Sequence, residues 1–224
     1  MNLKLLFILL IIILSFNTCG NILKKEFPKK KYFILEPDYS KIIQNSKYFH
    51  SIRIVRIKIS PFFEGKNFVY RQGDFNYESD FYNEFLIFPS NAFLESITRW
   101  LAESNTAEIL NNTIYEDTYL ISASVDSLYI DFRNEKTPKT ILEIQFTLQK
   151  NNEQESLFKK KYSYDGKIEI ISPEEIIKSW NIGLTDILLK FESDLRKIEL
   201  IPKQLPDIEK EKKSLKRKIN IQGK

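Results

Sequence analysis

The chain has very few of the residues on which disulfide, histidine and phosphate chemistry depend. It contains one cysteine, one histidine and six glycines among 224 residues. A single cysteine excludes an intramolecular disulfide and any metal site built from several cysteines. The glycines form neither a G-x-G-x-x-G nor a P-loop pattern, so the sequence does not indicate a nucleotide-hydrolysing subunit. The lone His50 has no nucleophile motif beside it, and we interpret it as a surface residue.

The acidic residues also show no pattern typical of a catalytic or metal site. One acidic group comprises Asp74, Glu78, Asp80 and Glu84, which fall within eleven positions. This group lacks the ligand spacing and the central glycine of a calcium-binding loop. We therefore predict a protein that is not an enzyme and that binds no metal and no cofactor.

The net charge of +4 is distributed unevenly along the chain. Residues 32–202 carry 20 basic and 26 acidic side chains, a net −6, whereas residues 24–31 carry +4 and residues 203–224 carry +5. Nucleic-acid binding usually needs basic residues gathered on a folded face, so we expect no nucleic-acid partner. Basic ends suit anionic lipid headgroups or an acidic partner. The alternative is that these ends are merely solvated and flexible.

Only one long apolar run is present, and it lies at the N-terminus. Leu5–Leu14 is an unbroken run of ten residues, which Ser15–Cys19 follows. As a helix, such a run would be about 15 Å long, roughly half the thickness of a bilayer hydrocarbon core. The stretch resembles a lipoprotein signal peptide, which is cleaved before a cysteine that is then acylated. We predict a signal peptide over residues 1–18 and lipidation of Cys19.

The residues just before the cysteine depart from the usual cleavage motif. Phe16 and Asn17 stand where that motif has leucine and a small residue. An uncleaved apolar anchor and cleavage without lipidation are therefore the alternatives. Beyond the signal peptide, we predict a lipid-anchored tether over residues 19–31, one globular domain over 32–200, and a charged, flexible tail over 201–224.

Two helices are predicted from apolar residues at helical spacing. The first begins near Ser90, after Pro89. The second has Ser172 as N-cap and Glu175 as the partner residue of a capping box. The apolar stripe of the first consists of Phe93, Leu94, Ile97 and Leu101, with Trp100 beside them. That of the second consists of Ile176, Trp180, Leu184, Ile187, Leu188, Phe191 and Leu195.

Alternating apolar and polar residues predict several strands. In one of them, Val55 marks either a phase change or a position that is apolar on both faces. In another, the phase shifts between Val125 and Leu128, and such a shift indicates a bulge. The order of strands and helices predicts an α/β domain with a mixed β-sheet and two main helices, with α+β as the alternative class. The predicted strands are Tyr32–Leu35, Ile52–Ile59, Phe68–Arg71, Tyr119–Phe132, Leu142–Leu148 and Phe158–Tyr164.

Aromatic residues are concentrated in residues 61–89, which hold ten of them among 29 positions. They occupy every phase of the pattern, so we expect some of them to form an exposed patch that contacts a partner or a lipid. The alternative is that all of them pack on the core. The predicted contact residues are Phe62, Phe63, Phe68, Tyr70, Arg71 and Tyr82.

Several stretches of the sequence resemble a known family. Besides the lipoprotein-like N-terminus, they are Tyr32–Pro37 (YFILEP), Phe62–Arg71 (FFEGKNFVYR), Tyr77–Pro89 (YESDFYNEFLIFP) and Phe93–Leu101 (FLESITRWL). Over about residues 30–195 the chain resembles the auxiliary lipoprotein component of ABC-type transport systems that work with MCE (MlaD-like) proteins. That group includes PqiC-like lipoproteins. The cleavage motif and the basic tail depart from the family pattern.

The resemblance implies a sandwich similar to the anticodon-binding-domain-like fold. It also implies a place beside an MCE protein, a permease and an ATPase that move lipids or other apolar molecules across the cell envelope. Phe68–Arg71, Asp80 and Tyr82 fall on signature positions of the family. The implied location is the periplasmic side of a diderm envelope. Gly20 after the cysteine favours the outer over the inner membrane, because retention in the inner membrane is associated with aspartate there.

Two other functions stay open at this stage. One is a periplasmic carrier that binds a lipid in an apolar cavity of its own. The other is an envelope-structural or outer-membrane assembly lipoprotein. The apolar stripe of the second helix must lie against a sheet or another subunit, so a homo-oligomer is open as well.

Overall fold

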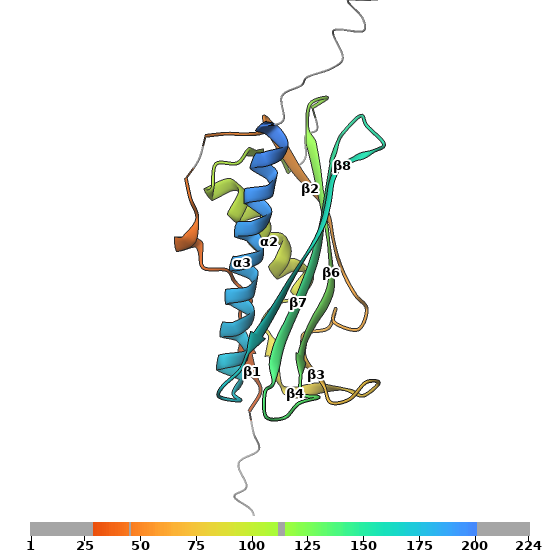
Figure 1. Cartoon of the computed structure of the whole chain (residues 1–224), viewed down its shortest axis with the longest axis vertical. Helices are drawn as coiled ribbons and strands as arrows, with labels where there is room; N and C mark the ends of the chain where they lie inside the picture. The colour runs from red at the N-terminus through yellow and green to blue at the C-terminus, as the bar shows by residue number, and fades with distance from the viewer. Residues whose placement is uncertain (1–28, 45, 112–114, 201–224) are drawn as a thin grey trace, which may run out of the picture. The chain divides into compact units, whose positions relative to one another are not determined.

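The structure of the chain is a computed structural model that describes residues 29–44, 46–111 and 115–200 (Figure 1). Within these residues, eight strands form one mixed sheet, which two α-helices accompany, and the predicted fold class is confirmed. The predicted signal peptide, Cys19, most of the predicted tether and the predicted C-terminal tail lie outside the described residues. The strands are β1 (Lys31–Phe33), β2 (Ser51–Ile59), β3 (Asn67–Arg71), β4 (Tyr77–Phe85), β5 (Glu108–Ile109), β6 (Tyr119–Asp131), β7 (Lys139–Lys150) and β8 (Ser156–Lys167). The helices are the 3-10 helix η2 (Tyr39–Lys41) and the α-helices α2 (Pro89–Glu103) and α3 (Pro173–Leu200).

The sheet is organised around the long strand β6. β7 pairs antiparallel with one edge of β6, and β8 pairs antiparallel with β7. Two strands share the other edge: β2 runs parallel to residues 119–125, and β3 runs parallel to residues 130–131. β5 extends the sheet beyond β2, whereas β4 and β1 extend it beyond β3. The sheet therefore branches into two arms on one side of β6.

The predicted phase shift between Val125 and Leu128 corresponds to an irregularity in the strand pairing, and at Val55 the structure favours a phase change over a two-sided position. The register of β2 against β6 shifts between Ile54 and Arg56, which leaves Val55 as the extra residue. The register of β6 against β7 shifts between Val125 and Ser127. An extra residue changes which face the following side chains occupy. The shifts thus keep the apolar residues of both strands directed toward the core.

Both α-helices cover the same face of the sheet (Figure 1). The Glu175 N–H donates to Ser172 Oγ at 3.2 Å, which confirms the predicted N-cap of α3. The hydrogen bond satisfies one of the amide groups that a helix leaves unpaired at its N-terminus. The predicted stripe of α3 is also confirmed, with every member at most 1 % exposed: Ile176, Trp180, Leu184, Ile187, Leu188, Phe191 and Leu195.

The buried face of α2 differs from the prediction at one position. Leu94 is 41 % exposed, whereas Trp100 is completely buried. The prediction that Leu94 belongs to the buried stripe is therefore wrong. Its side chain lies one position, about 100° of helix rotation, beyond the true stripe. That stripe has the spacing i, i+4, i+7 and i+8 and consists of Phe93, Ile97, Trp100 and Leu101.

One charged group is buried where the two helices meet. Glu192 of α3 is 1 % exposed, and its Oε2 accepts a hydrogen bond from Trp100 Nε1 at 3.0 Å. Its other oxygen pairs with Arg196 Nη2 at 2.5 Å. The guanidinium of Arg196 in turn lies 5.7 Å from the centroid of the Tyr48 ring. A hydrogen bond to an ionised group thus joins α2 to α3.

Strand β1 ends two residues before the predicted end at Leu35. Beyond Phe33 the backbone bonds to α3 instead of continuing along the sheet. The Glu36 N–H donates to Asn181 Oδ1 at 2.9 Å, and the Asp38 N–H donates to Thr185 Oγ1 at 2.8 Å. These bonds hold residues 34–39 against the outer side of the helix layer.

Candidate functional site

Two of the predicted contact residues belong to the core. Phe68 has no exposed surface, and its ring lies 5.3 Å from that of Phe33 and 5.2 Å from that of Trp180. Phe63 is 7 % exposed and stacks on Tyr129 at 5.6 Å. Both side chains are enclosed by their own domain. The prediction that they contact a partner or lipid is corrected for this reason.

Tyr70 is half-buried and acts together with Asp80 inside the domain. Tyr70 Oη donates to Asp80 Oδ2 at 2.7 Å. Burial and the neighbouring carboxylate raise the pKa of Tyr70, which keeps its hydroxyl protonated. Burial alone would raise the pKa of Asp80, but hydrogen bonds from Tyr70, Asn83 and the Tyr82 backbone outweigh it and lower the pKa. The geometry therefore gives Tyr70 a structural role.

The Asp80 carboxylate organises a wide irregularity in β4. The pairing of β3 with β4 passes from Asn67 opposite Glu84 directly to Val69 opposite Ser79. Residues 80–83 thus lie outside the β3–β4 ladder, although Asn83 still pairs with Lys31 of β1. There, Asp80 Oδ1 accepts from the backbone N–H groups of Tyr82 and Asn83.

This irregularity places two aromatic side chains on the surface. Phe81 is 65 % exposed and Tyr82 is 42 % exposed, and their rings meet edge to face at 5.2 Å. Tyr82 is accessible, and its contact with a partner or lipid stays a prediction.

Arg71 and Phe62 have opposite environments. Arg71 is half-buried and holds the turn between β3 and β4, where its guanidinium donates to the carbonyl oxygens of Gly73 and Asp74 at 3.2 Å each. Phe62 is 81 % exposed. Phe75, which was not among the predicted contacts, is 99 % exposed. Of the six predicted contact residues, Phe62 therefore presents the most accessible ring.

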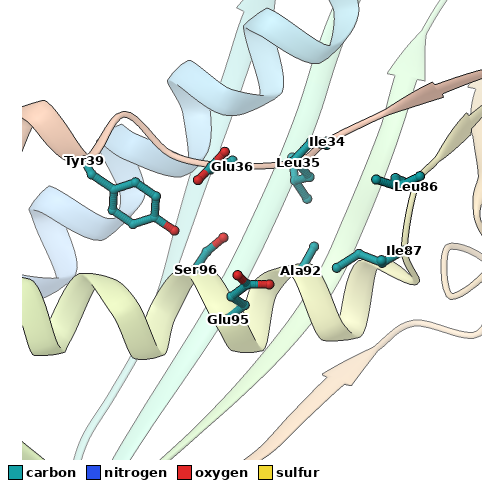
Figure 2. Close-up of a pocket in the computed structure, with 9 residues that line it drawn as sticks. All are labelled: Ile34, Leu35, Glu36, Tyr39, Leu86, Ile87, Ala92, Glu95 and Ser96. Atoms are coloured by element: carbon teal, nitrogen blue, oxygen red, sulfur yellow. The ribbon is translucent and has the colours of Figure 1, made fainter.

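The structure also contains an apolar pocket that was not predicted from the sequence. Residues 34–39 lie between α2 and α3, and the pocket opens beside them with a volume of about 280 Å³ (Figure 2). Ile34, Leu86 and Ile87 line it and are 57 %, 48 % and 40 % exposed. The full lining comprises Ile34, Leu35, Glu36, Tyr39, Leu86, Ile87, Ala92, Glu95 and Ser96.

One end of this pocket is polar and rigidly held. Figure 2 shows Tyr39 at that end and Leu86 and Ile87 at the other. The Arg99 guanidinium lies 3.9 Å from the centroid of the Tyr39 ring and also pairs with Glu36 at 3.3 Å. Burial raises the pKa of Tyr39 above its ordinary value. The pocket thus combines an ordered polar end with an exposed apolar end.

A second depression lies on the other side of the same segment. It has a volume of about 630 Å³ and is formed by residues 34–41 and the outer side of α3. Ile182 of α3 lines it and is 53 % exposed, and Ile34 lines both depressions. We refer to the two depressions as the Ile34 grooves. Exposed apolar side chains bordered by charged ones are typical of a protein-binding surface.

Two further kinds of feature, metal-binding clusters and membrane-spanning helices, are absent from the described residues. Within residues 29–44, 46–111 and 115–200, no three histidine, cysteine or acidic side chains are placed to hold a metal ion. None of the helices in that part of the chain has the length and apolar character needed to cross a bilayer. His50 is exposed, as predicted.

Comparison with known proteins finds relatives in fold. No family model and no curated protein matches the sequence. A Xanthomonas campestris protein of the DUF330 family has a TM-score of 0.61 and 9 % identity, covering 79 % of this chain and 98 % of that one. A second structure, described as an uncharacterized protein, has a TM-score of 0.59 and 11 % identity, covering 75 % of this chain and 99 % of that one. At these identities the likeness establishes the fold alone.

A lipoprotein from Neisseria meningitidis is a more distant match. It has a TM-score of 0.37 and 10 % identity, covering 65 % of this chain and 99 % of that one. This likeness is too weak to bear on the function of the present chain.

Proposed function

We propose that this chain is a lipid-anchored, non-enzymatic auxiliary subunit of an ABC/MCE-type transporter that moves lipids or other apolar molecules across the cell envelope. One observation carries the proposal: a cysteine placed for acylation lies twelve residues before Lys31, where a domain with exposed apolar grooves begins. The sequence resemblance supports the type of transporter. Its partners would be an MCE (MlaD-like) protein, the permease and the ATPase, and its location the periplasmic side of the envelope, with the outer membrane favoured.

The Ile34 grooves are the proposed docking surface for the protein partner. Large apolar side chains near the centre of an interface supply most of its binding energy. Ile34, Leu86 and Ile87 offer such side chains, and their exposed fractions of 40–57 % leave them accessible. A docking role depends on shape and on apolar surface, which these side chains provide.

An Ile34→Asp variant tests the docking surface. It is expected to lower recovery of the MCE partner at least tenfold, because a desolvated carboxylate in an apolar interface costs more than the ~1.4 kcal/mol that corresponds to tenfold. The measurement is affinity purification of the tagged full chain from its own membranes, with partners quantified by mass spectrometry. The control is Ile170→Asp, which introduces the same charge at another isoleucine that is 68 % exposed. Equal recovery with both variants would count against the grooves.

A Cys19→Ser variant tests the anchor. It is expected to carry no acyl group such as palmitate and to leave the membrane fraction, because the serine hydroxyl is not the thiol that the lipid transfer requires. Intact-protein mass spectrometry and membrane fractionation measure these two outcomes. Asn17→Ser, which keeps the thiol, is the control. Unchanged membrane association of the Cys19→Ser protein would assign the anchor to the apolar run Leu5–Leu14.

The alternative of a lipid carrier has less support. The smaller Ile34 groove, at about 280 Å³, lies just below the roughly 300–1,000 Å³ of typical small-molecule sites. The larger one, at about 630 Å³, is bordered by Ile34 and Ile182, both more than half exposed. Native mass spectrometry of the purified chain decides between the two functions, since a carrier would retain a lipid beyond its covalent acyl groups.

A further inference from the structure

The face of the sheet that the helices leave uncovered carries cations in a regular arrangement. Figure 1 shows α2 and α3 on one face only. On the other face, strand pairing aligns side chains of β2, β6, β7 and β8 in rows across the sheet. One row consists of Arg56, Ser122, Thr147 and Lys159. The next consists of Lys58, Ser124, Gln145 and Lys161. Each row has a cation at both ends and hydroxyl or amide groups between, and we call the two the cationic rows.

Three of these four cations have no partner among the described residues. Lys161 pairs with Asp126 at 2.7 Å. Against the residues that the structure describes, Arg56, Lys58 and Lys159 make no side-chain hydrogen bond or ion pair. Residues 32–202 as a whole carry a net −6, so this local excess of positive charge differs in sign from the rest of the domain. Ser124 Oγ donates to Asp126 Oδ1 at 2.9 Å, whereas Ser122 and Thr147 keep their hydroxyl groups available beside the unpaired cations, and this combination favours an anionic ligand.

Exposed phenylalanines lie on the same side of the sheet. Tyr129 points to the uncovered face, because Leu128 and Ile130 on either side of it are buried beneath the helices. Phe63 stacks on Tyr129, which folds the β2–β3 loop onto that face, and its neighbour Phe62 is 81 % exposed. Figure 1 shows this loop and the β3–β4 turn on the side away from the helices. Aromatic rings near lysine and arginine are typical of a membrane–water interface.

We infer that the cationic rows and Phe62 rest on the anionic headgroups of the membrane that holds the anchor. The chain from Cys19 to Lys31 can extend about 40 Å at most, so the domain stays within reach of the bilayer. Each lysine or arginine close to an anionic bilayer strengthens its association about fivefold. For an already anchored domain, a few such contacts are sufficient to set its orientation. The tether and the tail are also basic, so neither of them offers the negative charge that would bind the cationic rows.

A membrane surface fits this face better than a protein does. Between their terminal cations the two rows hold only serine, threonine and glutamine, and a protein interface needs apolar anchors at its centre. With the sheet on the membrane, the Ile34 grooves, which lie in the helix layer, would face away from it toward a partner. The inference rests on the proposed anchor for the proximity of the bilayer, and it does not depend on the identity of the transporter.

Lysine labelling of the full, lipidated chain tests the inference. The protein is reconstituted into phosphatidylcholine vesicles with or without phosphatidylglycerol and treated with a water-soluble acylating reagent, and each lysine is quantified by mass spectrometry. Lys58 and Lys159 are expected to react at least fivefold more slowly on the anionic vesicles. Lys178 and Lys190, exposed on α3, are expected to react equally on both. Raising the salt concentration should abolish the difference.

A pair of double variants provides the matched control. Arg56→Gln with Lys159→Gln should remove the protection of Lys58, whereas Lys178→Gln with Lys190→Gln, an equal loss of charge on the helix side, should keep it. The inference would be overturned if the labelling rate of Lys58, like that of Lys190, were the same on anionic and on neutral vesicles. Protection of Lys58 that appears only when a partner protein is added would overturn it as well. Absence of an MCE protein from the material purified with the unsubstituted chain would refute the proposed function and leave the labelling result unaffected.

Discussion

Replacing Trp180 by alanine is expected to destabilise the domain by about 3–5 kcal/mol. The indole is completely buried between α3 and the sheet, where its ring centroid lies 5.2 Å from that of Phe68 and 5.5 Å from that of Phe85. Its Nε1 donates to the carbonyl oxygen of Ile141 at 3.3 Å. Truncation removes this hydrogen bond and leaves a cavity that rigid neighbouring rings cannot fill.

Urea unfolding of the full chain, followed by circular dichroism, measures this effect. The control is Ile182→Ala on the same helix, where the side chain is 53 % exposed, and its expected loss is below about 0.5 kcal/mol. If Trp180→Ala unfolded at the midpoint of the unsubstituted protein, the buried stripe of α3 would instead be a surface that binds another subunit.

Replacing Arg196 by methionine is expected to cost about 2–4 kcal/mol. Removing one partner of a buried ion pair typically costs ~3–5 kcal/mol, because the other charge stays buried without compensation. Here the Arg196 side chain is 26 % exposed while that of Glu192 is 1 % exposed, so water screens part of the effect. Methionine keeps much of the packing of the arginine stem.

Two further variants distinguish the loss of the ion pair from the loss of packing contacts in Arg196→Met. Lys190→Met removes a pair of the same i,i+4 spacing with Asp186, but both of those side chains are exposed, and the expected loss is at most about 0.5 kcal/mol. Combining Arg196→Met with Glu192→Gln should recover part of the stability, because a neutral amide tolerates burial better than a carboxylate. A double variant no more stable than Arg196→Met would show that lost contacts of the arginine dominate.

The elements with a long local pattern are the ones that the sequence predicts well. The stripe of α3 and the clean alternation of β7 depend only on neighbouring residues, and burial follows directly from their periods. β5 has two residues and η2 three, too few to show a period. The end of β1 depends on Asn181 and Thr185, which are about 145 positions away in sequence. Contacts with residues so far away produce no pattern in the sequence around β1 itself.

The contact residues were harder to predict because adjacent aromatic residues differ in environment. Phe62 is exposed and Phe63 is buried, and the difference follows from stacking of Phe63 on Tyr129, which lies in a different part of the sheet. The concentration of aromatics predicts a patch but does not identify its members. The Ile34 grooves likewise combine three segments that are distant in the sequence, residues 34–41, 86–96 and 177–189.

The cationic rows form a positively charged surface on a domain whose net charge is negative. Basic excess was expected only at the two ends of the chain, since residues 32–202 are acidic overall. Strand alternation nevertheless gathers Arg56 and Lys58 of β2 with Lys159 and Lys161 of β8 on one face, and the register aligns Arg56 with Lys159 across four strands. This alignment cannot be predicted from the net charge of the domain or from the alternation of side chains within one strand.

The branching of the sheet at β6 has a consequence for how the chain folds. The β6–β7–β8 meander and the β3–β4 hairpin join strands that are close in sequence, so their loops close with little loss of entropy. The two arms join β6 through parallel pairs such as Tyr70 with Ile130, sixty positions later. High contact order slows folding. We therefore expect the local meander and hairpin to form early. The docking of both arms onto β6 is then expected to limit the folding rate of the domain.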